Sequence, residues 1–210
     1  MTDGVFVFGA SGHAKVVIDA IERLGTSQVL FVCDDAREKH GTRLMGYPVT
    51  DREELLARRA DARTGVVGIG DNTARMQVAA WLAGQGCTLT RVVHPAASIA
   101  REVKIDEGTV IMAGCVVNSG THLGKNVIVN TGATVDHDCS IGEGVHIAPG
   151  SHLCGGVSIG AGTLIGAAAC GGSDVPDPDT AAETRADSTP AGDLIAPAGD
   201  SSRPTPPGLA

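Results

Sequence analysis

The middle of this chain repeats with a period of six residues, and this period restricts the fold more than any other feature. Every sixth residue from position 93 to position 165 is aliphatic without a break. A helix would repeat with a period of about 3.6 residues and a flat strand with a period of about 2, so neither accounts for the series. The aliphatic residues are Val93, Ile99, Ile105, Ile111, Val117, Leu123, Val129, Val135, Ile141, Ile147, Leu153, Ile159 and Ile165.

A period of six predicts a parallel β-helix built from hexads, which are runs of six residues that each form one side of a triangular coil. We expect each aliphatic side chain to point into the narrow prism and to stack on the aliphatic residue three hexads away. Many hexads also have glycine one or three positions after the aliphatic residue, as Gly142 and Gly144 follow Ile141. Glycine adopts positive φ at little cost, so these glycines are expected at the corners of the coil.

The residues before position 93 instead alternate strand and helix signals. The expected elements are strands at 5–8, 29–33, 65–69 and 89–93 and helices at 14–24 and 73–82. Gly25 is expected to end the first helix, and Thr50 with Glu53 is expected to form a capping box before a further helix. Alternating strands and helices predict a small parallel sheet of the Rossmann-like α/β type.

The chain is therefore predicted to have three parts. Residues 1–92 form the Rossmann-like domain, 93–170 form the β-helix, and 171–210 form a tail. The tail is rich in acidic residues, holds most of the chain's 10 prolines and lacks the period of six. Such a composition cannot bury enough apolar surface to order itself, so the tail is expected to be disordered.

Composition argues against several classes of protein. The net charge is −8, and the few aromatic residues do not alternate with basic ones, which argues against a nucleic-acid surface. No apolar stretch reaches the length of about 18 residues that a membrane-spanning helix requires. The N-terminus lacks the basic segment of a signal peptide, so a cytoplasmic protein is expected. The six cysteines show no C-x-x-C spacing and are expected to be reduced core residues without metal or redox work.

The first strand–helix turn has the features of an anion-binding loop. Gly9-Ala-Ser-Gly12-His13 follows a strand and opens a helix, so its backbone N–H groups suit a diphosphate. The dinucleotide fingerprint requires glycine where this chain has Ser11 and Ala14, which argues against NAD. A nucleotide-linked sugar is the expected ligand, with Asp34 or Asp35 accepting hydrogen bonds from base or ribose. The alternative is a tight turn that binds nothing.

His137 is the candidate catalytic residue of the coil, because a prism of aliphatic residues has no structural need for it. Asp136 and Asp138 flank it, and a carboxylate beside an imidazole fixes its tautomer and raises its basicity. Neighbours on a flat strand point to opposite faces, so Asp138 reaches His137 only if the chain turns a corner there. His122 and His152 are expected on a solvated face.

The distance between His137 and His146 along the chain bears on oligomeric state. The two residues are nine positions apart, which is half of an eighteen-residue coil. Within one chain they therefore lie on different sides of the prism. They can meet only across an interface between prisms packed side by side. The spacing therefore favours a homotrimer with sites between its chains.

Five segments together resemble the bacterial nucleotide-amino-sugar acetyltransferases and the related sialic-acid O-acetyltransferases of the left-handed β-helix superfamily. The resemblance covers residues 4 to about 170. Within this family, the chain is most similar to the perosamine and UDP-4-amino-sugar N-acetyltransferases. The segments are 7–17 (VFGASGHAKVV), 46–49 (GYPV), 69–72 (IGDN), 130–139 (NTGATVDHDC) and 153–160 (LCGGVSIG).

The resemblance implies a fold, a reaction and a set of site residues. It implies a left-handed parallel β-helix, a trimer, and acetyl-CoA-dependent N-acetylation of a nucleotide-linked amino sugar in surface glycan biosynthesis, without a metal. His137 would be the general base and Asp138 its partner. The residues implied for acetyl-CoA are His146, Gly155 and Ala167, and those implied for the nucleotide-linked sugar are Gly12, His13, Asp34 and Asp35.

Three alternatives remain open from the sequence. The first is O-acetyl transfer to sialic acid or a related sugar hydroxyl with the same base, His137. The second is a non-catalytic, truncated β-helix protein, because the hexads stop at Cys170 whereas the family continues through further coils that help to bind coenzyme A. The composition of the tail would also suit translation of a GC-rich gene in a shifted reading frame. Without the further coils, acetyl-CoA binding is expected to be weak. The third is a zinc hydrolyase on the same fold, which the histidine spacing disfavours.

Overall fold

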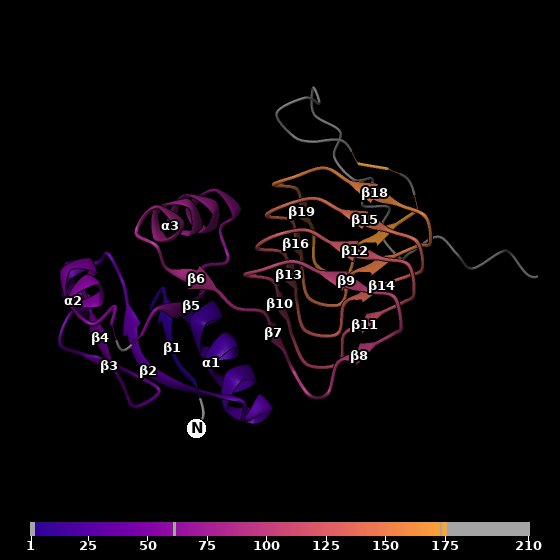
Figure 1. Ribbon diagram of the computed structural model, residues 1–210. Coiled ribbons are helices and arrows are strands. Elements are labelled where there is room, and N and C mark those ends of the chain that lie inside the picture. The colour runs from indigo at the N-terminus through magenta and orange to yellow at the C-terminus, as the bar shows by residue number, and fades with distance from the viewer. Residues whose placement is uncertain (1–2, 61, 173, 176–210) are drawn as a thin grey trace, which may run out of the picture.

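The computed structural model describes residues 3–60, 62–172 and 174–175, which form a sheet with helices followed by a triangular coil (Figure 1). The N-terminal sheet has six strands in the order β3-β4-β2-β1-β5-β6. All neighbours pair in parallel except β3 and β4, which are antiparallel. The strands are β1 (Asp3–Phe8), β2 (Ser27–Cys33), β3 (Arg43–Leu44), β4 (Tyr47–Thr50), β5 (Thr64–Val67) and β6 (Thr88–Leu89). The expected Rossmann-like sheet is confirmed.

Three α-helices and one short 3-10 helix connect these strands. They are α1 (Gly12–Leu24), η1 (Arg37–Lys39), α2 (Arg52–Ala57) and α3 (Asn72–Gly84). Gly25 ends α1 in the left-handed conformation with φ of 68°, as expected. The capping box expected from Thr50 was wrong, because Thr50 pairs with Cys33 as the last residue of β4. The N-cap of α2 is instead Asp51, whose side chain accepts a hydrogen bond from the amide of Glu54.

The alternating side chains of β1 contribute to two cores, one on each face of the sheet. Val5 and Val7 pack in the cluster that contains the buried face of α1 and continues into the coil. Phe6 and Phe8 pack on the opposite face with residues of α2 and α3. Since successive side chains of a strand point to opposite faces, one short apolar run anchors both helical layers.

The coil is a left-handed parallel β-helix with three flat sides, each a parallel sheet (Figure 1). The sheets are β19-β16-β13-β10-β7, β20-β17-β14-β11-β8 and β18-β15-β12-β9. From β7 to β19, the second residue of each strand is the aliphatic residue of the period-six series. The strands are β7 (Val92–Val93), β8 (Ser98–Ile99), β9 (Lys104–Ile105), β10 (Val110–Ile111), β11 (Val116–Val117), β12 (His122–Leu123), β13 (Ile128–Val129), β14 (Thr134–Val135), β15 (Ser140–Ile141), β16 (His146–Ile147), β17 (His152–Leu153), β18 (Ser158–Ile159), β19 (Leu164–Ile165) and β20 (Cys170–Gly171).

Positive φ recurs at the corners with the same period of six. It occurs at residues 102, 108, 114, 120, 126, 132, 138, 144, 150, 156, 162 and 168. Eight of these are glycine, which confirms the expected use of glycine at the corners. The other four are Glu102, Asn126, Asp138 and Ala168, and a residue with a side chain is unfavourable in this conformation. Nothing in the structure explains the choice of Ala168.

Three residues that the sequence assigns to the tail, Gly171, Asp174 and Val175, contact the coil. Cys170 and Gly171 form β20, and Val175 forms a bridge with Ile159. The amide of Val175 donates to the carbonyl of Ser158 at 2.8 Å, and Asp174 accepts from the amide of Ser158 at 2.7 Å. These bonds cover part of the edge of β18, so disorder was the wrong expectation for residues 171, 174 and 175. Residues 173 and 176–210 of the predicted tail lie outside the described residues.

Arg75 connects the N-terminal part to the coil. This α3 side chain is only 2% exposed, and all five of its hydrogen bonds go to carbonyl or amide oxygens. Two of them reach the coil, at the carbonyls of Asn126 (2.9 Å) and Gly144 (2.6 Å). The other three reach Ile69, Gly70 and Asn72 in the loop before α3 and its first turn. This guanidinium therefore helps to hold the loop against the coil.

We expect Arg75→Met to lower the free energy of unfolding by roughly 3 kcal/mol, because it leaves buried carbonyls without a donor. Urea denaturation measures this change. The control is Arg23→Met, which removes an exposed ion pair with Asp19 and should change the free energy by less than about 0.5 kcal/mol. Equal midpoints for the two variants would contradict the role assigned to Arg75.

Candidate active site

His137 and Asp138 form a hydrogen-bonded pair just beyond β14. The Nδ1 atom of His137 lies 2.9 Å from Oδ2 of Asp138. The two side chains are 63% and 72% exposed, so the pair lies open at the surface of the coil. When Nδ1 carries the proton and donates it to the carboxylate, Nε2 keeps a free lone pair. The arrangement therefore supplies a proton acceptor of defined tautomer.

A corner of the coil makes this contact between adjacent residues possible. Asp138 has φ of 59°, so it occupies a corner position that glycine fills in most other hexads. Asp is among the few residues that tolerate this conformation. The chain thus turns between His137 and Asp138, and their side chains approach each other instead of pointing to opposite faces.

Asp136 provides a second carboxylate close to the imidazole. Its Oδ1 accepts hydrogen bonds from Asn118 Nδ2 at 2.7 Å and from the amide of His137 at 2.8 Å. These two bonds lower the pKa of the Asp136 carboxyl, with the Asn118 bond the larger cause. The hydrogen bond to Asp138 and the charge of Asp136 in turn raise the pKa of His137. The pair of acids therefore makes His137 a stronger base than a free imidazole.

The structure places the three residues implied for acetyl-CoA on two sides of the prism. Gly155 follows β17, which pairs with β14, and it lies beside the His137 ring. His146 is in β16 and Ala167 follows β19, and these two strands pair in a different sheet. Within one chain, Gly155 is therefore grouped with the candidate base, and the other two are grouped together on another side.

His146 lies where the coil meets the N-terminal part. Its Nδ1 lies 3.2 Å from the carbonyl of Gly70 and its Nε2 lies 3.0 Å from Nδ2 of Asn130. These partners are consistent with a proton on Nδ1 and a lone pair on Nε2. Burial, followed by the charge of Arg75, lowers the pKa of His146, although the Gly70 bond opposes this. His146 is therefore neutral at pH 7.

His13 in the first turn of α1 lies next to His146, with ring centroids 6.2 Å apart. Burial lowers the pKa of His13 to about 4, and the charges of His146 and Arg75 act in the same direction. Its Nε2 is buried without a hydrogen-bond partner among the described residues. The start of α1, with the exposed Gly12, is thereby joined to the β16 side of the coil. Sequence reasoning did not identify Arg75, and it included Gly70 only as part of the segment 69–72.

Asp34 holds the loop before α1, residues 9–11, in place. Its carboxylate accepts from the amide of Ala10 at 2.6 Å, from the amide of Ala36 at 2.9 Å and from Lys39 at 3.0 Å. Burial alone would raise the pKa of Asp34, but the bonds from Ala36, Ala10 and Lys39 outweigh it and lower that pKa. Asp34 therefore stays charged at neutral pH and determines the path of the loop before α1.

Asp35 has a different environment. Both of its oxygens accept from Arg52, at 2.6 Å from Nε and 2.7 Å from Nη2. The Asp35 side chain is 55% exposed. The two adjacent acids thus differ, since Asp34 binds backbone amides of the loop and Asp35 forms a surface ion pair.

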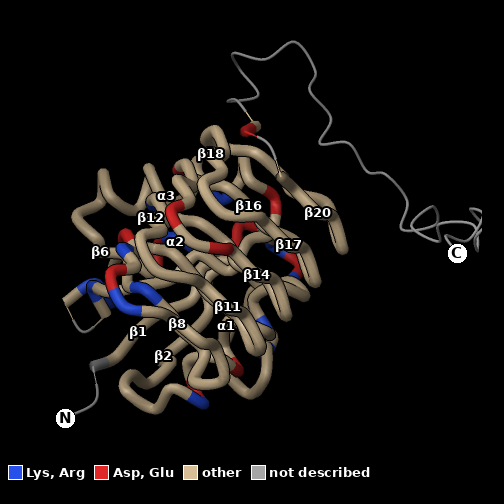
Figure 2. Tube along the Cα trace, turned by 90° about the vertical axis from the view of Figure 1, so that its right-hand side faces the viewer, with Lys and Arg blue, Asp and Glu red and all other residues tan. Residues whose placement is uncertain are grey.

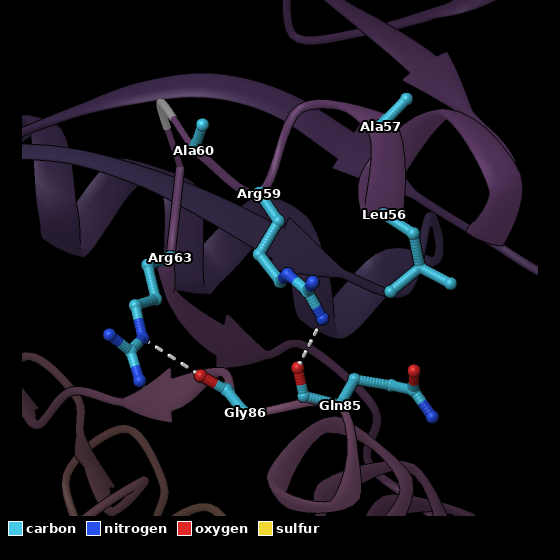
Figure 3. Close-up of a pocket in the computed structure, with 7 residues that line it drawn as sticks. All are labelled: Leu56, Ala57, Arg59, Ala60, Arg63, Gln85 and Gly86. Atoms are coloured by element: carbon cyan, nitrogen blue, oxygen red, sulfur yellow. Dashed lines mark hydrogen bonds between the residues drawn. The ribbon is translucent and has the colours of Figure 1, made fainter.

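A surface hollow on the N-terminal part lies apart from all these residues (Figure 3). It lies between the end of α2 and the end of α3. Arg59 and Arg63 cross it and donate to the carbonyls of Gln85 and Gly86, at 2.8 and 2.9 Å. It contains none of the candidate site residues, and its arginines are already engaged in joining two segments.

Two further observations concern metal-binding sites and membrane-spanning helices. Among the described residues, no group of three or more His, Cys, Asp and Glu side chains has the arrangement of a metal site. No helix in the described part of the chain has the length and apolar character needed to cross a membrane.

The chain is similar to known proteins along both parts. Residues 4–82 match the model of the PglD N-terminal domain, and residues 138–169 match the bacterial transferase hexapeptide model of six repeats. A histidine-to-asparagine variant of perosamine N-acetyltransferase from Caulobacter crescentus, solved with CoA and GDP-perosamine, is 33% identical. Its TM-score is 0.75, and the match covers 85% of this chain and 92% of that one.

Two other solved structures extend this similarity. The acetyltransferase domain of PglB from Neisseria gonorrhoeae FA1090, in complex with acetyl coenzyme A, is 38% identical with a TM-score of 0.74. That match covers 81% of this chain and 82% of that one. WeeI from Acinetobacter baumannii AYE is 26% identical over 83% of this chain and 94% of its own, with a TM-score of 0.68.

The geometry predicts how His137 titrates. Asp138→Asn removes the negative charge next to Nδ1, so we expect the pKa of His137 to fall relative to the unaltered protein. An NMR titration of the histidine ring nuclei measures it without any substrate. Asp106→Asn is the control, because Asp106 lies next to His122 on another side of the coil and should leave the His137 titration unchanged. An identical His137 pKa with Asn at position 138 would contradict the pairing.

Proposed function

We propose that this chain, which belongs to the hexapeptide-repeat acetyltransferases of nucleotide-linked amino sugars, transfers an acetyl group from acetyl-CoA to the amino group of such a sugar. The observation that carries the proposal for the site is the exposed His137–Asp138 pair, in which Nε2 is free to accept a proton. The reaction serves surface glycan biosynthesis, in which nucleotide-linked amino sugars are building blocks.

In the reaction, the neutral sugar amine attacks the carbonyl carbon of the acetyl thioester. A carbon–nitrogen bond forms and the carbon–sulfur bond breaks, so coenzyme A leaves as a thiolate. The amine loses a proton, which Nε2 of His137 accepts. His137 then passes this proton to the leaving sulfur. Asp138 holds the opposite nitrogen and stabilises the imidazolium that forms. No acyl-enzyme is needed, because the neutral amine is itself a good nucleophile.

The surface around His137 fits the uncharged arm of acetyl-CoA. From residue 144 to residue 172 the chain has no Lys, Arg, Asp or Glu, and the tube in Figure 2 is tan at β18 and β20. Gly155 brings its backbone beside the ring of His137, where a backbone N–H can stabilise the oxyanion of the tetrahedral intermediate. Small, neutral residues here leave room for a thioester.

The nucleotide is bound by the N-terminal part, residues 1–92, and the acetyl transfer takes place on the coil, residues 93–170. Gly12 and His13 begin α1, whose N-terminal backbone amides favour a diphosphate. Asp34 maintains the shape of this loop through the amide of Ala10. Asp35 then offers its exposed carboxylate to the base or ribose.

A homotrimer completes the site. His137 follows β14 and His146 is in β16, and these strands belong to different sheets of one prism. The nucleotide loop lies on the His146 side, through the contact between His146 and His13. Packing three prisms side by side brings His137 of one chain towards the nucleotide loop and His146 of its neighbour. Sedimentation equilibrium of the full chain tests this state.

The proposed compartment is the cytoplasm. All six cysteines are free thiols, and Cys154 and Cys170 are exposed. Exposed free thiols persist in a reducing compartment, where disulfides are rare.

Incubation of the full chain with acetyl-CoA and either GDP- or UDP-linked amino sugars tests the activity. We expect release of the CoA thiol and a product heavier by one acetyl group on nitrogen, seen by mass spectrometry. A matched sugar with a hydroxyl group in place of the amine should not react. Acetylation of that hydroxyl or of sialic acid, with no reaction of the amines, would overturn the proposed substrate class.

His137→Ala should lower kcat by roughly 10²–10⁴-fold, the usual contribution of a general base, with little effect on KM. Steady-state kinetics at saturating substrate measures it. The chain offers a matched control in His122, an exposed histidine that is 3.0 Å from Asp106 on another sheet. His122→Ala should leave kcat unchanged. Undiminished turnover by the His137 variant would refute its role as the base.

Asp34→Ala should raise KM for the nucleotide-linked sugar by roughly tenfold, because the loss of a charged hydrogen bond to the Ala10 amide lets the loop move. KM for acetyl-CoA should stay constant. Asp35→Ala is the paired variant, which reports the direct contact of a carboxylate with the nucleotide. A loss of acetyl-CoA affinity in either variant, with sugar affinity unchanged, would contradict the assignment of the nucleotide to this loop.

A further inference from the structure

The coil places a glycine directly above His137 and another directly below Asp138. Residues on the same side of successive coils are spaced 18 positions apart, as Asn118 and Asp136 are. Gly155 is therefore the neighbour of His137 on the next coil, and Gly120 is the neighbour of Asp138 on the previous coil. The backbone contacts agree, since the amide of Gly156 donates to the carbonyl of His137 at 2.8 Å and the amide of Asp138 donates to that of Ser119 at 3.0 Å.

Both glycines leave space that the paired side chains use. A Cβ atom at Gly155 would lie 2.6 Å from Cε1 and 2.6 Å from Nε2 of His137, closer than non-bonded atoms approach. A Cβ atom at Gly120 would overlap the Oδ1 atom of Asp138. The imidazole thus lies against Gly155, and the carboxylate lies against Gly120.

The backbone requires glycine at one of these two positions and not at the other. Gly120 has φ of 78°, so the corner itself requires it. Gly155 is not among the residues with positive φ, and its backbone conformation suits any L-residue. Its missing side chain therefore serves the ring of His137 and not the turn of the chain.

We propose that Gly155 is a positioning residue for the catalytic base, because the absence of its side chain lets the His137 ring lie against the coil within hydrogen-bond distance of Asp138. This inference rests on the proposed function, in which His137 accepts the proton. It gives Gly155 a role beyond contact with acetyl-CoA. A methyl group at position 155 turns the exposed ring outward into solvent and away from Asp138.

Gly155→Ala tests the proposal with little risk to folding, because the displaced ring is 63% exposed and can move. We expect an unchanged melting temperature and a fall in kcat of roughly 10- to 100-fold, as for a catalytic group displaced by about 1 Å. KM for acetyl-CoA should not change, and the His137 pKa should fall towards that of a free imidazole in an NMR titration. Gly166→Ala is the control, since a Cβ there meets nothing within 4 Å, and it should leave the His137 titration unchanged.

A double-mutant cycle separates positioning from direct contact with acetyl-CoA. In the His137→Ala background there is no ring to displace, so Gly155→Ala should cause no further loss of kcat. A loss that persists in that background, or a rise in KM for acetyl-CoA, would overturn the proposal. So would a His137 pKa that is unchanged in the single Gly155→Ala variant. If His137→Ala alone leaves turnover intact, the proposed base fails, while the NMR titration still decides whether Gly155 positions the ring.

Discussion

The hydrogen bonds between successive coils are the constraint on which the rest of this structure depends. Each coil binds the next through backbone N–H and carbonyl groups, as Asp136 does with Leu153 at 3.0 Å. Because these backbone bonds recur from coil to coil in one register, each side chain has fixed neighbours above and below. The residue at one position therefore limits what its neighbours three hexads away can be. The pairs formed by Gly155 with His137 and by Gly120 with Asp138 follow from this register.

Asp138 shows what it costs to place a side chain at a corner of the coil. A residue with a side chain costs about 1–2 kcal/mol in the left-handed conformation, and Asp and Asn are the residues for which that cost is smallest. The same conformation brings the Asp138 carboxylate to the imidazole, 2.9 Å away. Asn126 occupies another corner, and its carbonyl accepts from the buried Arg75. Two of the four exceptions to glycine, Asp138 and Asn126, thus lie where the corner residue hydrogen-bonds to another side chain.

Arg75 has a comparable role between the two parts. Its guanidinium is buried among carbonyl oxygens, and burial lowers its pKa to about 10, so the charge persists at neutral pH. A buried charge is stable only when its donors are satisfied. Its five bonds meet this requirement and also fix the loop at Gly70, whose carbonyl lies 3.2 Å from Nδ1 of His146. Arg75 therefore contributes to the orientation of the loop before α3 towards the coil.

The sequence by itself determined the coil, because a period of six in the aliphatic residues has one structural solution, and its corners could be read from the glycines. It also predicted the alternating strands and helices, since their periods are local. It misplaced the start of α2, because pairing of Thr50 with Cys33 is a contact between distant residues. Only the tertiary structure decided that Asp138 turns towards His137, that Asp34 binds the Ala10 amide, and that Arg75 joins the two parts. These contacts depend on distances between segments far apart in the chain or on a backbone angle at a single residue, and neither leaves a period in the sequence.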